Sequence, residues 1–119
     1  MGEIKSYKDL IVWQKSHKLC NRAIDLVEKF KYGKASNIIS EQLIRSATSI
    51  PANIAEGYGR HKGKEFQNYL YIAKGSALET DYWLFLCSER NLIDKNEYSE
   101  LAKICNEIIL MLFSIIRKL

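Results

Sequence analysis

The sequence predicts an all-α protein, an antiparallel up-down-up-down four-helix bundle that residues 1–119 form as a single domain. Three observations carry this prediction. Apolar residues recur at steps of three and four along four long segments, no segment alternates apolar and polar residues as a strand would, and the connections between segments are short. The length of 119 residues also matches that of one domain.

The first predicted helix, over about residues 10–30, has two neighbouring apolar lines. Two adjoining lines make a wide buried face, and Gly33 ends the pattern. One line contains Leu10, Trp13, His17, Cys20, Ile24 and Val27, and the other contains Val12, Ser16, Leu19, Ala23, Leu26 and Phe30.

The second predicted helix begins near Ser36 or Asn37, because either side chain can cap its free amides, and it ends at Gly57. Pro51 lacks the N–H that a helix interior needs, so we expect a kink or a new start there. A glycine-rich turn follows, up to Gly63.

The third predicted helix covers residues 64–89, and its middle, Ala73–Ala77, consists mostly of small residues that allow close approach of another helix. The fourth follows a capping box that opens at Asp94 and closes at Glu97, and its apolar residues alternate strictly at three and four.

Two runs in these helices, Tyr82–Leu86 and Ile108–Phe113, are apolar all the way round. A helix in an isolated bundle keeps a polar outward face. We therefore expect the chain to associate with itself. The alternative is that some of these side chains are scattered exposed apolar residues, which are ordinary.

The net charge of +4 is local, because residues 1–35 carry eight basic and four acidic side chains, and residues 60–64 add three basic ones. Basic residues recur every seven positions along the first helix, and the turn around His61 opens a helix, whose free amides favour anions. Both features suit nucleic-acid phosphate, although charges on such surfaces also serve solvation alone. The candidate contacts are Lys8, Lys15, Lys18, Arg22, Lys29, Arg60, Lys62 and Lys64.

A polar line crosses the proline of the second helix and mixes short hydrogen-bonding groups with one arginine. In an antiparallel hairpin this arginine lies level with the middle of the third helix, so we expect a buried Arg45–Glu79 pair that fixes the register. A structural use of the line is favoured over ligand binding. Its members are Arg45, Ser49, Asn53 and Glu56, followed by Gly57, with Ser76 and Glu79 facing them.

No pattern supports an enzyme, a cofactor or a metal. The glycines at 57 and 63 are six apart and Glu65 follows Lys64, so a nucleotide-binding loop is excluded. His17, Cys20, Cys87 and Cys105 could together form a tetrahedral metal site. The simpler interpretation is that the three cysteines are buried, reduced core residues and that the histidine is hydrogen-bonded. The odd cysteine count predicts a reducing compartment, the cytosol, and the chain lacks the apolar segments of a signal peptide or membrane span.

With these residues in view, the sequence resembles a bacterial family of small four-helix bundles named after the 23S rRNA intervening-sequence protein. The resemblance covers nearly the whole chain. Three segments carry it: YKDLIVWQK (7–15), QLIRSATSIPANIAEGYGR (42–60), which is the most specific, and AKGSALE (73–79).

The resemblance implies a four-helix bundle that assembles as a homopentamer, as in the related accessory protein of diversity-generating retroelements. It also implies contact with RNA or with a nucleic-acid-handling protein, since some members are encoded inside rRNA genes and the retroelement relative works alongside a reverse transcriptase. It supplies no catalytic residue. Our leading hypothesis is a non-enzymatic homo-oligomer that contacts RNA or DNA phosphate, and the runner-up is a scaffolding module whose charges only confer solubility.

Overall fold

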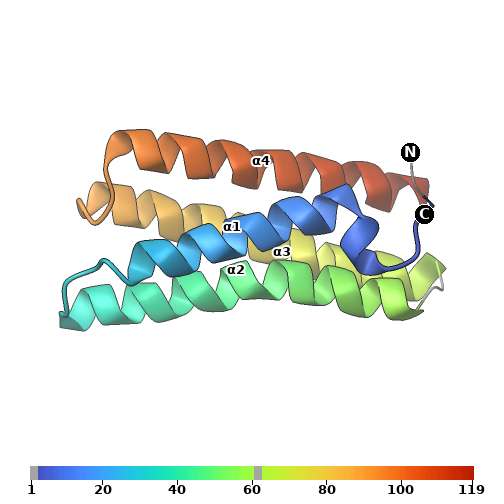
Figure 1. The fold of residues 1–119 in the computed structure, drawn as a ribbon, viewed down its shortest axis with the longest axis horizontal. Coiled ribbons are helices and arrows are strands. Elements are labelled where there is room, and N and C mark those ends of the chain that lie inside the picture. Colours follow the sequence, from blue (N-terminus) through green and yellow to red (C-terminus); the bar gives the residue numbers. More distant parts are fainter. Residues whose placement is uncertain (1–2, 61–62) are drawn as a thin grey trace.

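The protein, described by a computed structural model over residues 3–60 and 63–119, consists of long helices packed side by side (Figure 1). A 3-10 helix, η1 (Tyr7–Asp9), precedes α1 (Ile11–Val27), α2 (Lys34–Arg60), α3 (Gly63–Glu89) and α4 (Lys95–Lys118). The described ranges contain four α-helices and no strand, which confirms the all-α prediction. The molecule measures 44 × 26 × 21 Å.

Each helix packs against its neighbours in the sequence, and α1 also packs against α4. Figure 1 shows the α1–α2 and α3–α4 connections at one end of the molecule, whereas α2 ends and α3 begins at the other. Among the described elements α1 and α3 make no mutual contact, so they lie diagonally across the bundle. A surface on α1 is therefore separate from a surface on α3.

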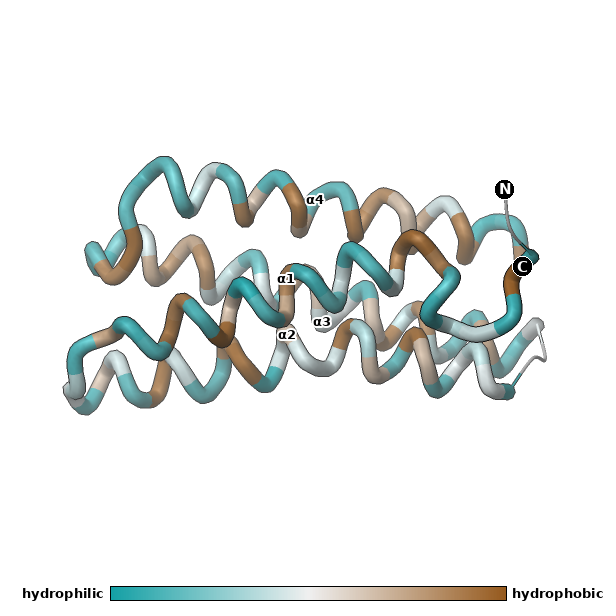
Figure 2. Tube along the Cα trace, in the orientation of Figure 1, coloured by the Kyte–Doolittle hydropathy of each residue, from teal (hydrophilic) through white to brown (hydrophobic). Residues whose placement is uncertain are grey.

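The core is mostly apolar, with the buried hydroxyls of Ser16, Ser46 and Thr80 among its apolar side chains. Brown and teal segments alternate along the helices in Figure 2. In α1 the line through Val12, Leu19 and Leu26 is buried. The neighbouring line is only partly buried, and its member His17 is exposed. The face of α1 that enters the core is therefore narrower than the two lines predicted, because among the described α-helices α1 packs against α2 and α4 and makes no contact with α3.

The start of α2 differs from the prediction. Ser36 and Asn37 lie inside the helix, and the carbonyl of Gly33 accepts the Asn37 N–H at 2.9 Å. The Ser36 hydroxyl instead donates to the Lys31 carbonyl at 2.8 Å. The helix also continues across Pro51, which is buried, so the predicted new start is absent and core packing offsets the missing N–H.

The predicted turn at Gly57 is also wrong, because α2 continues to Arg60. Gly57 is a contact point rather than a helix end. A Cβ placed on it would lie 2.7 Å from the Cβ of Tyr69 and 3.0 Å from Cδ1 of Phe66, both on α3. The absence of a side chain therefore lets the backbone of α2 approach α3.

In the α3–α4 connection, residues close in sequence satisfy the free backbone groups at the end of α3 and the start of α4. Asn91 adopts a left-handed φ of 61°, and the Leu92 N–H reaches the Cys87 carbonyl at 2.9 Å, which satisfies the end of α3. The Asp94 carboxylate accepts the Glu97 N–H at 2.8 Å and caps α4, as the sequence predicts.

We expect Gly57→Ala to destabilise the protein by about 1–3 kcal/mol, because the added methyl overlaps Tyr69 and forces α2 and α3 apart. Gly59→Ala is the matched control, since nothing lies within 4 Å of its Cβ position. The control should gain about 0.5 kcal/mol from helix propensity. Urea unfolding measures both, and equal effects of the two substitutions would contradict the close approach at Gly57.

Candidate interaction surfaces

The side chains considered as metal ligands do not come together. The described part of the chain holds no group of three or more side chains able to bind a metal. Cys20, Cys87 and Cys105 are free and buried, as predicted. His17 was predicted on a buried line but is exposed, and its ring stacks on Trp13 with centroids 4.8 Å apart.

The buried thiols are poor nucleophiles. Burial raises the pKa of Cys87 to about 11 and that of Cys105 to about 12, and the Cys105 thiol donates to the Ala77 carbonyl at 3.1 Å. Burial also raises the pKa of Cys20. A neutral thiol is unreactive, so these cysteines serve as core residues.

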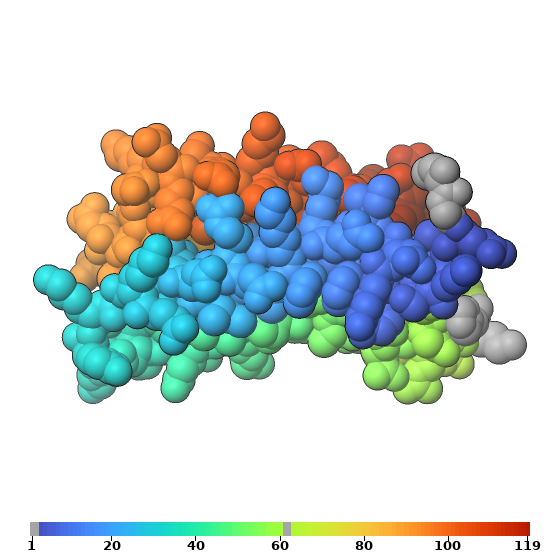
Figure 3. All heavy atoms as spheres, in the orientation of Figure 1, coloured from blue at the N-terminus to red at the C-terminus, as the bar shows by residue number. Residues whose placement is uncertain are grey.

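The basic line of the first helix is partly neutralised by α4. Lys15 pairs with Glu107 at 3.3 Å and Arg22 pairs with Glu100 at 2.8 Å. Lys8 lies in η1, outside α1, so the seven-residue repeat does not continue along one helix. Figure 3 shows α1 along the middle of this face, between α2 and α4.

The cations that keep their charge free on this face are Lys18 and Lys29. Both are exposed, and no carboxylate of the described residues pairs with either. A phosphate contact would therefore begin with these two side chains. The carboxylates of Glu100 and Glu107 compete with phosphate for Lys15 and Arg22.

The charge of the basic turn between α2 and α3 is also partly neutralised by nearby carboxylates. Arg60 pairs with Glu56 at 3.1 Å and approaches Glu65 at 3.9 Å, and its guanidinium lies over the Tyr69 ring, 5.6 Å from the centroid. Tyr69 and Glu56 raise the pKa of Arg60. Lys64 is exposed at the start of α3, and the predicted contact Lys62 lies outside the described residues.

The polar line forms a hydrogen-bonded seam between α2 and α3. The Ser76 hydroxyl donates to the Ser49 hydroxyl at 2.9 Å, and the Asn53 amide donates to the same oxygen at 2.9 Å. Deeper in the bundle, the Thr80 hydroxyl donates to the Ser46 hydroxyl at 2.9 Å. These hydroxyls satisfy one another, which supports the structural use of the line.

The predicted burial of the Arg45–Glu79 pair is wrong for the single chain. The register is right, since Arg45 Nη2 lies 3.9 Å from Glu79 Oε2. The side chains point out of the α2–α3 groove, however, and are 73% and 41% exposed. Glu79 also accepts the indole N–H of Trp83 at 3.0 Å, a contact that the sequence analysis did not identify.

An apolar stripe runs along the outside of α3. Its large side chains are about half exposed, and Gly75 among them has open space at its Cβ position. Their spacing alternates between four and three residues, the repeat by which one helix packs on another. We call this the α3 stripe: Tyr71, Gly75, Leu78, Tyr82 and Phe85.

Part of α4 extends this apolar surface. Phe113 is 45% exposed, and the Lys74 ammonium of α3 lies 5.0 Å from its ring centroid. At the other end, the rings of Phe85 and Tyr98 are 6.3 Å apart. The exposed members of the Tyr82–Leu86 and Ile108–Phe113 runs are thus the residues that the core cannot accommodate.

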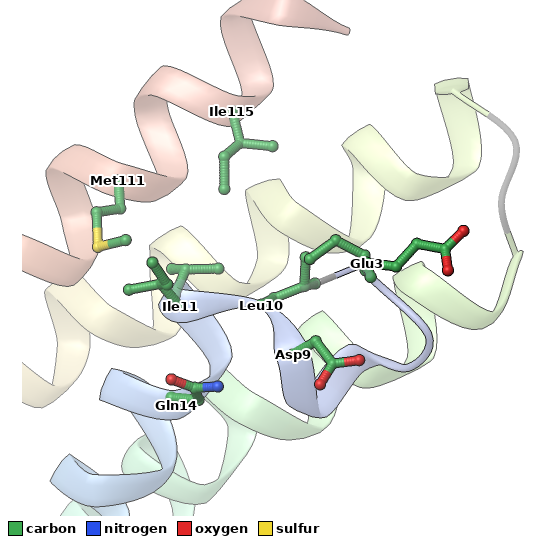
Figure 4. A pocket seen from close by; sticks show the side chains of 9 residues that line it. Glu3, Asp9, Leu10, Ile11, Gln14, Met111 and Ile115 are labelled. Atoms are coloured by element: carbon green, nitrogen blue, oxygen red, sulfur yellow. The ribbon is translucent and has the colours of Figure 1, made fainter. Parts of the chain in front are cut away.

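A separate hollow of about 480 Å³ lies where the N-terminal segment crosses α1 and α4 (Figure 4). Ile11, Met111 and Ile115 supply apolar walls, and Glu3 and Asp9 lie at its edge. The Asp9 carboxylate already accepts the backbone N–H groups of Lys5 and Ser6, the second of these as part of the capping box of η1. The hollow therefore offers apolar walls and few free polar groups.

Over the described residues, every helix is too short or too polar to pass through a membrane. The fold and its surfaces define an all-α four-helix protein whose described polar groups form seams and surface pairs. The chain belongs to the 23S rRNA-intervening sequence protein family, whose model matches residues 8–114. This match confirms the resemblance drawn from the sequence segments.

Among solved structures, the chain is similar to a protein of unknown function from the S23 ribosomal protein family of Bacteroides thetaiotaomicron VPI-5482. The two sequences are 33% identical, and the match covers 89% of this chain and 98% of that one with a TM-score of 0.79. No curated protein matches the sequence.

We expect Cys87 and Cys105 to resist N-ethylmaleimide at neutral pH in the folded protein, because both thiols are fully buried and their raised pKa values keep them neutral. Cys20, at 8% exposure, should react first. Mass spectrometry counts the added groups, and the unfolded protein should take three. Rapid labelling of all three in the native state would contradict the described core.

Proposed function

We propose that the protein is a non-enzymatic, homo-oligomeric helical bundle with antiparallel up-down-up-down topology. The α3 stripe is the observation that carries this proposal. A helix on the outside of an isolated bundle presents polar residues to water, whereas α3 presents Leu78, Tyr82 and Phe85. Covering these side chains with protein is favourable, because burial removes apolar area from water.

The size of the surface supports a stable assembly. Seven large apolar side chains on α3 and α4 are about half exposed, and at roughly 100 Å² each they present on the order of 700 Å², close to the roughly 800 Å² that each partner gives a standard interface. A monomer seldom exposes a larger patch. The family resemblance favours a pentamer, and the three unpaired cysteines favour the cytosol.

Contact with nucleic-acid phosphate is the second candidate function. Lys18 on α1 and Lys29 just beyond the end of α1 keep free charges. Because α1 lies diagonally from α3, assembly through the α3 stripe leaves Lys18 accessible. The family name refers to 23S rRNA. The pairing of Lys15 and Arg22 with carboxylates supports the rival interpretation, a scaffolding module whose surface charges confer only solubility.

We expect purified protein to elute well above 13.8 kDa, with a pentamer favoured, because burial of the α3 stripe drives association. Size-exclusion chromatography with light scattering measures the mass. A monomer at micromolar concentration would contradict both the apolar-surface argument and the expected pentamer.

If the α1 face binds phosphate, changing Lys15, Lys18 and Arg22 to Glu should abolish binding of mixed-sequence RNA and double-stranded DNA. The double variant Glu100→Gln, Glu107→Gln should bind more tightly, because it releases Lys15 and Arg22 from their pairs. Each released cation that reaches a phosphate of double-stranded DNA should steepen the slope of log binding constant against log salt concentration by about 0.9.

Titrations at two salt concentrations compare these variants with the wild type. Equal binding by all variants, or no binding of the wild type at low salt, would leave the basic face as a solvated surface. The scaffolding interpretation would then replace nucleic-acid contact, and self-association would be unaffected.

A further inference from the structure

Glu79 and Arg45 lie along the edge of the α3 stripe that faces α2. Glu79 follows Leu78 directly, and its carboxylate oxygen Oε2 both accepts the Trp83 N–H at 3.0 Å and lies 3.9 Å from Arg45. Because both charged groups are substantially exposed, water weakens their attraction in the single chain. The donors for this carboxylate are nevertheless already in place.

The stripe has the geometry of a helix-packing surface. Its residues recur at alternating steps of four and three over positions 71–85, about 21 Å along the helix axis. The small position at Gly75 lies between large side chains, so the surface offers both protrusions and a gap. An occupant that matches this repeat is another helix.

The charges beside the stripe identify the occupant as a second copy. Arg45 and Glu79 lie on the α2 edge, and Lys74 and Asp81 lie toward α4, so each edge carries one cation and one carboxylate. A surface balanced in this way does not repel its own copy. A strongly acidic or basic partner would gain no net electrostatic attraction from this surface. The exposed apolar area on α3 and α4 is close to the area that one copy contributes to a stable interface.

We propose that a second copy of the chain packs along the α3 stripe, and that this packing buries Arg45 and Glu79 and closes them into a hydrogen-bonded pair. This inference rests on the proposed self-association. The pair then selects the correct alignment of the two copies, since any alignment that covers Glu79 without Arg45 strands a charge in the interface. The pair is thus a specificity determinant of assembly.

Sedimentation velocity over a dilution series of the full chain tests this proposal. Leu78→Glu places a charge in the stripe and should yield monomers. Ile11→Glu is its matched control, because Ile11 is 59% exposed on α1, diagonal to α3, against 51% for Leu78. The control should assemble as the wild type does.

The pair is tested in the same way. Glu79→Ala should weaken association on the order of 100-fold, since it leaves Arg45 buried without a partner. Asp25→Ala removes an exposed carboxylate on α1 and should change association less than about threefold. The exchanged pair, Arg45→Glu with Glu79→Arg, should recover most of the association that either single exchange loses. Circular dichroism verifies that each variant keeps its helices.

The outcomes separate the two proposals. A monomeric wild type would overturn self-association and this inference together. A wild-type oligomer that Ile11→Glu disrupts and Leu78→Glu leaves intact would overturn only the assignment to α3. Equal association of Glu79→Ala and Asp25→Ala would overturn the role of the pair while leaving the stripe in place.

Discussion

The close packing of α2 against α3 determines where the candidate surfaces lie. Gly57 lets the two backbones approach at Tyr69, and the hydroxyl pairs Ser49–Ser76 and Ser46–Thr80 satisfy the polar groups that this approach buries. A buried hydroxyl without a partner would cost free energy, so the contacts fix one alignment of the two helices. Larger side chains at these positions would separate the helices.

That alignment has consequences for α3. Its inner residues, among them Leu70, Ala77 and Leu84, are fully buried. A helix that contacts α2 and α4 retains one outward face, and on α3 this face carries Tyr71, Leu78 and Tyr82. The same alignment places Arg45 beside Glu79 at the edge of the stripe. The alignment of α2 with α3 therefore determines the position of both the polar seam and the apolar stripe.

The α1 face shows why charge along a sequence is an incomplete guide to a binding surface. Basic residues repeat every seven positions, but Glu100 and Glu107 come from α4 and pair with two of them. A linear count of charge cannot include partners from another helix. The free cations are known only once α1 and α4 are packed, and Lys18 on α1 lies diagonally across the bundle from the α3 stripe.

The sequence by itself determined the four helices, the start of α4 at its Asp94 cap, the level of Arg45 with Glu79 and the surplus of apolar residues, because periodicity and caps are local properties. Tertiary structure decided that α2 continues through Pro51 and Gly57, since the packing that makes a buried proline or glycine tolerable comes from distant residues. It also decided which charges are neutralised and that the Arg45–Glu79 pair faces outward, because exposure depends on which neighbours cover each face.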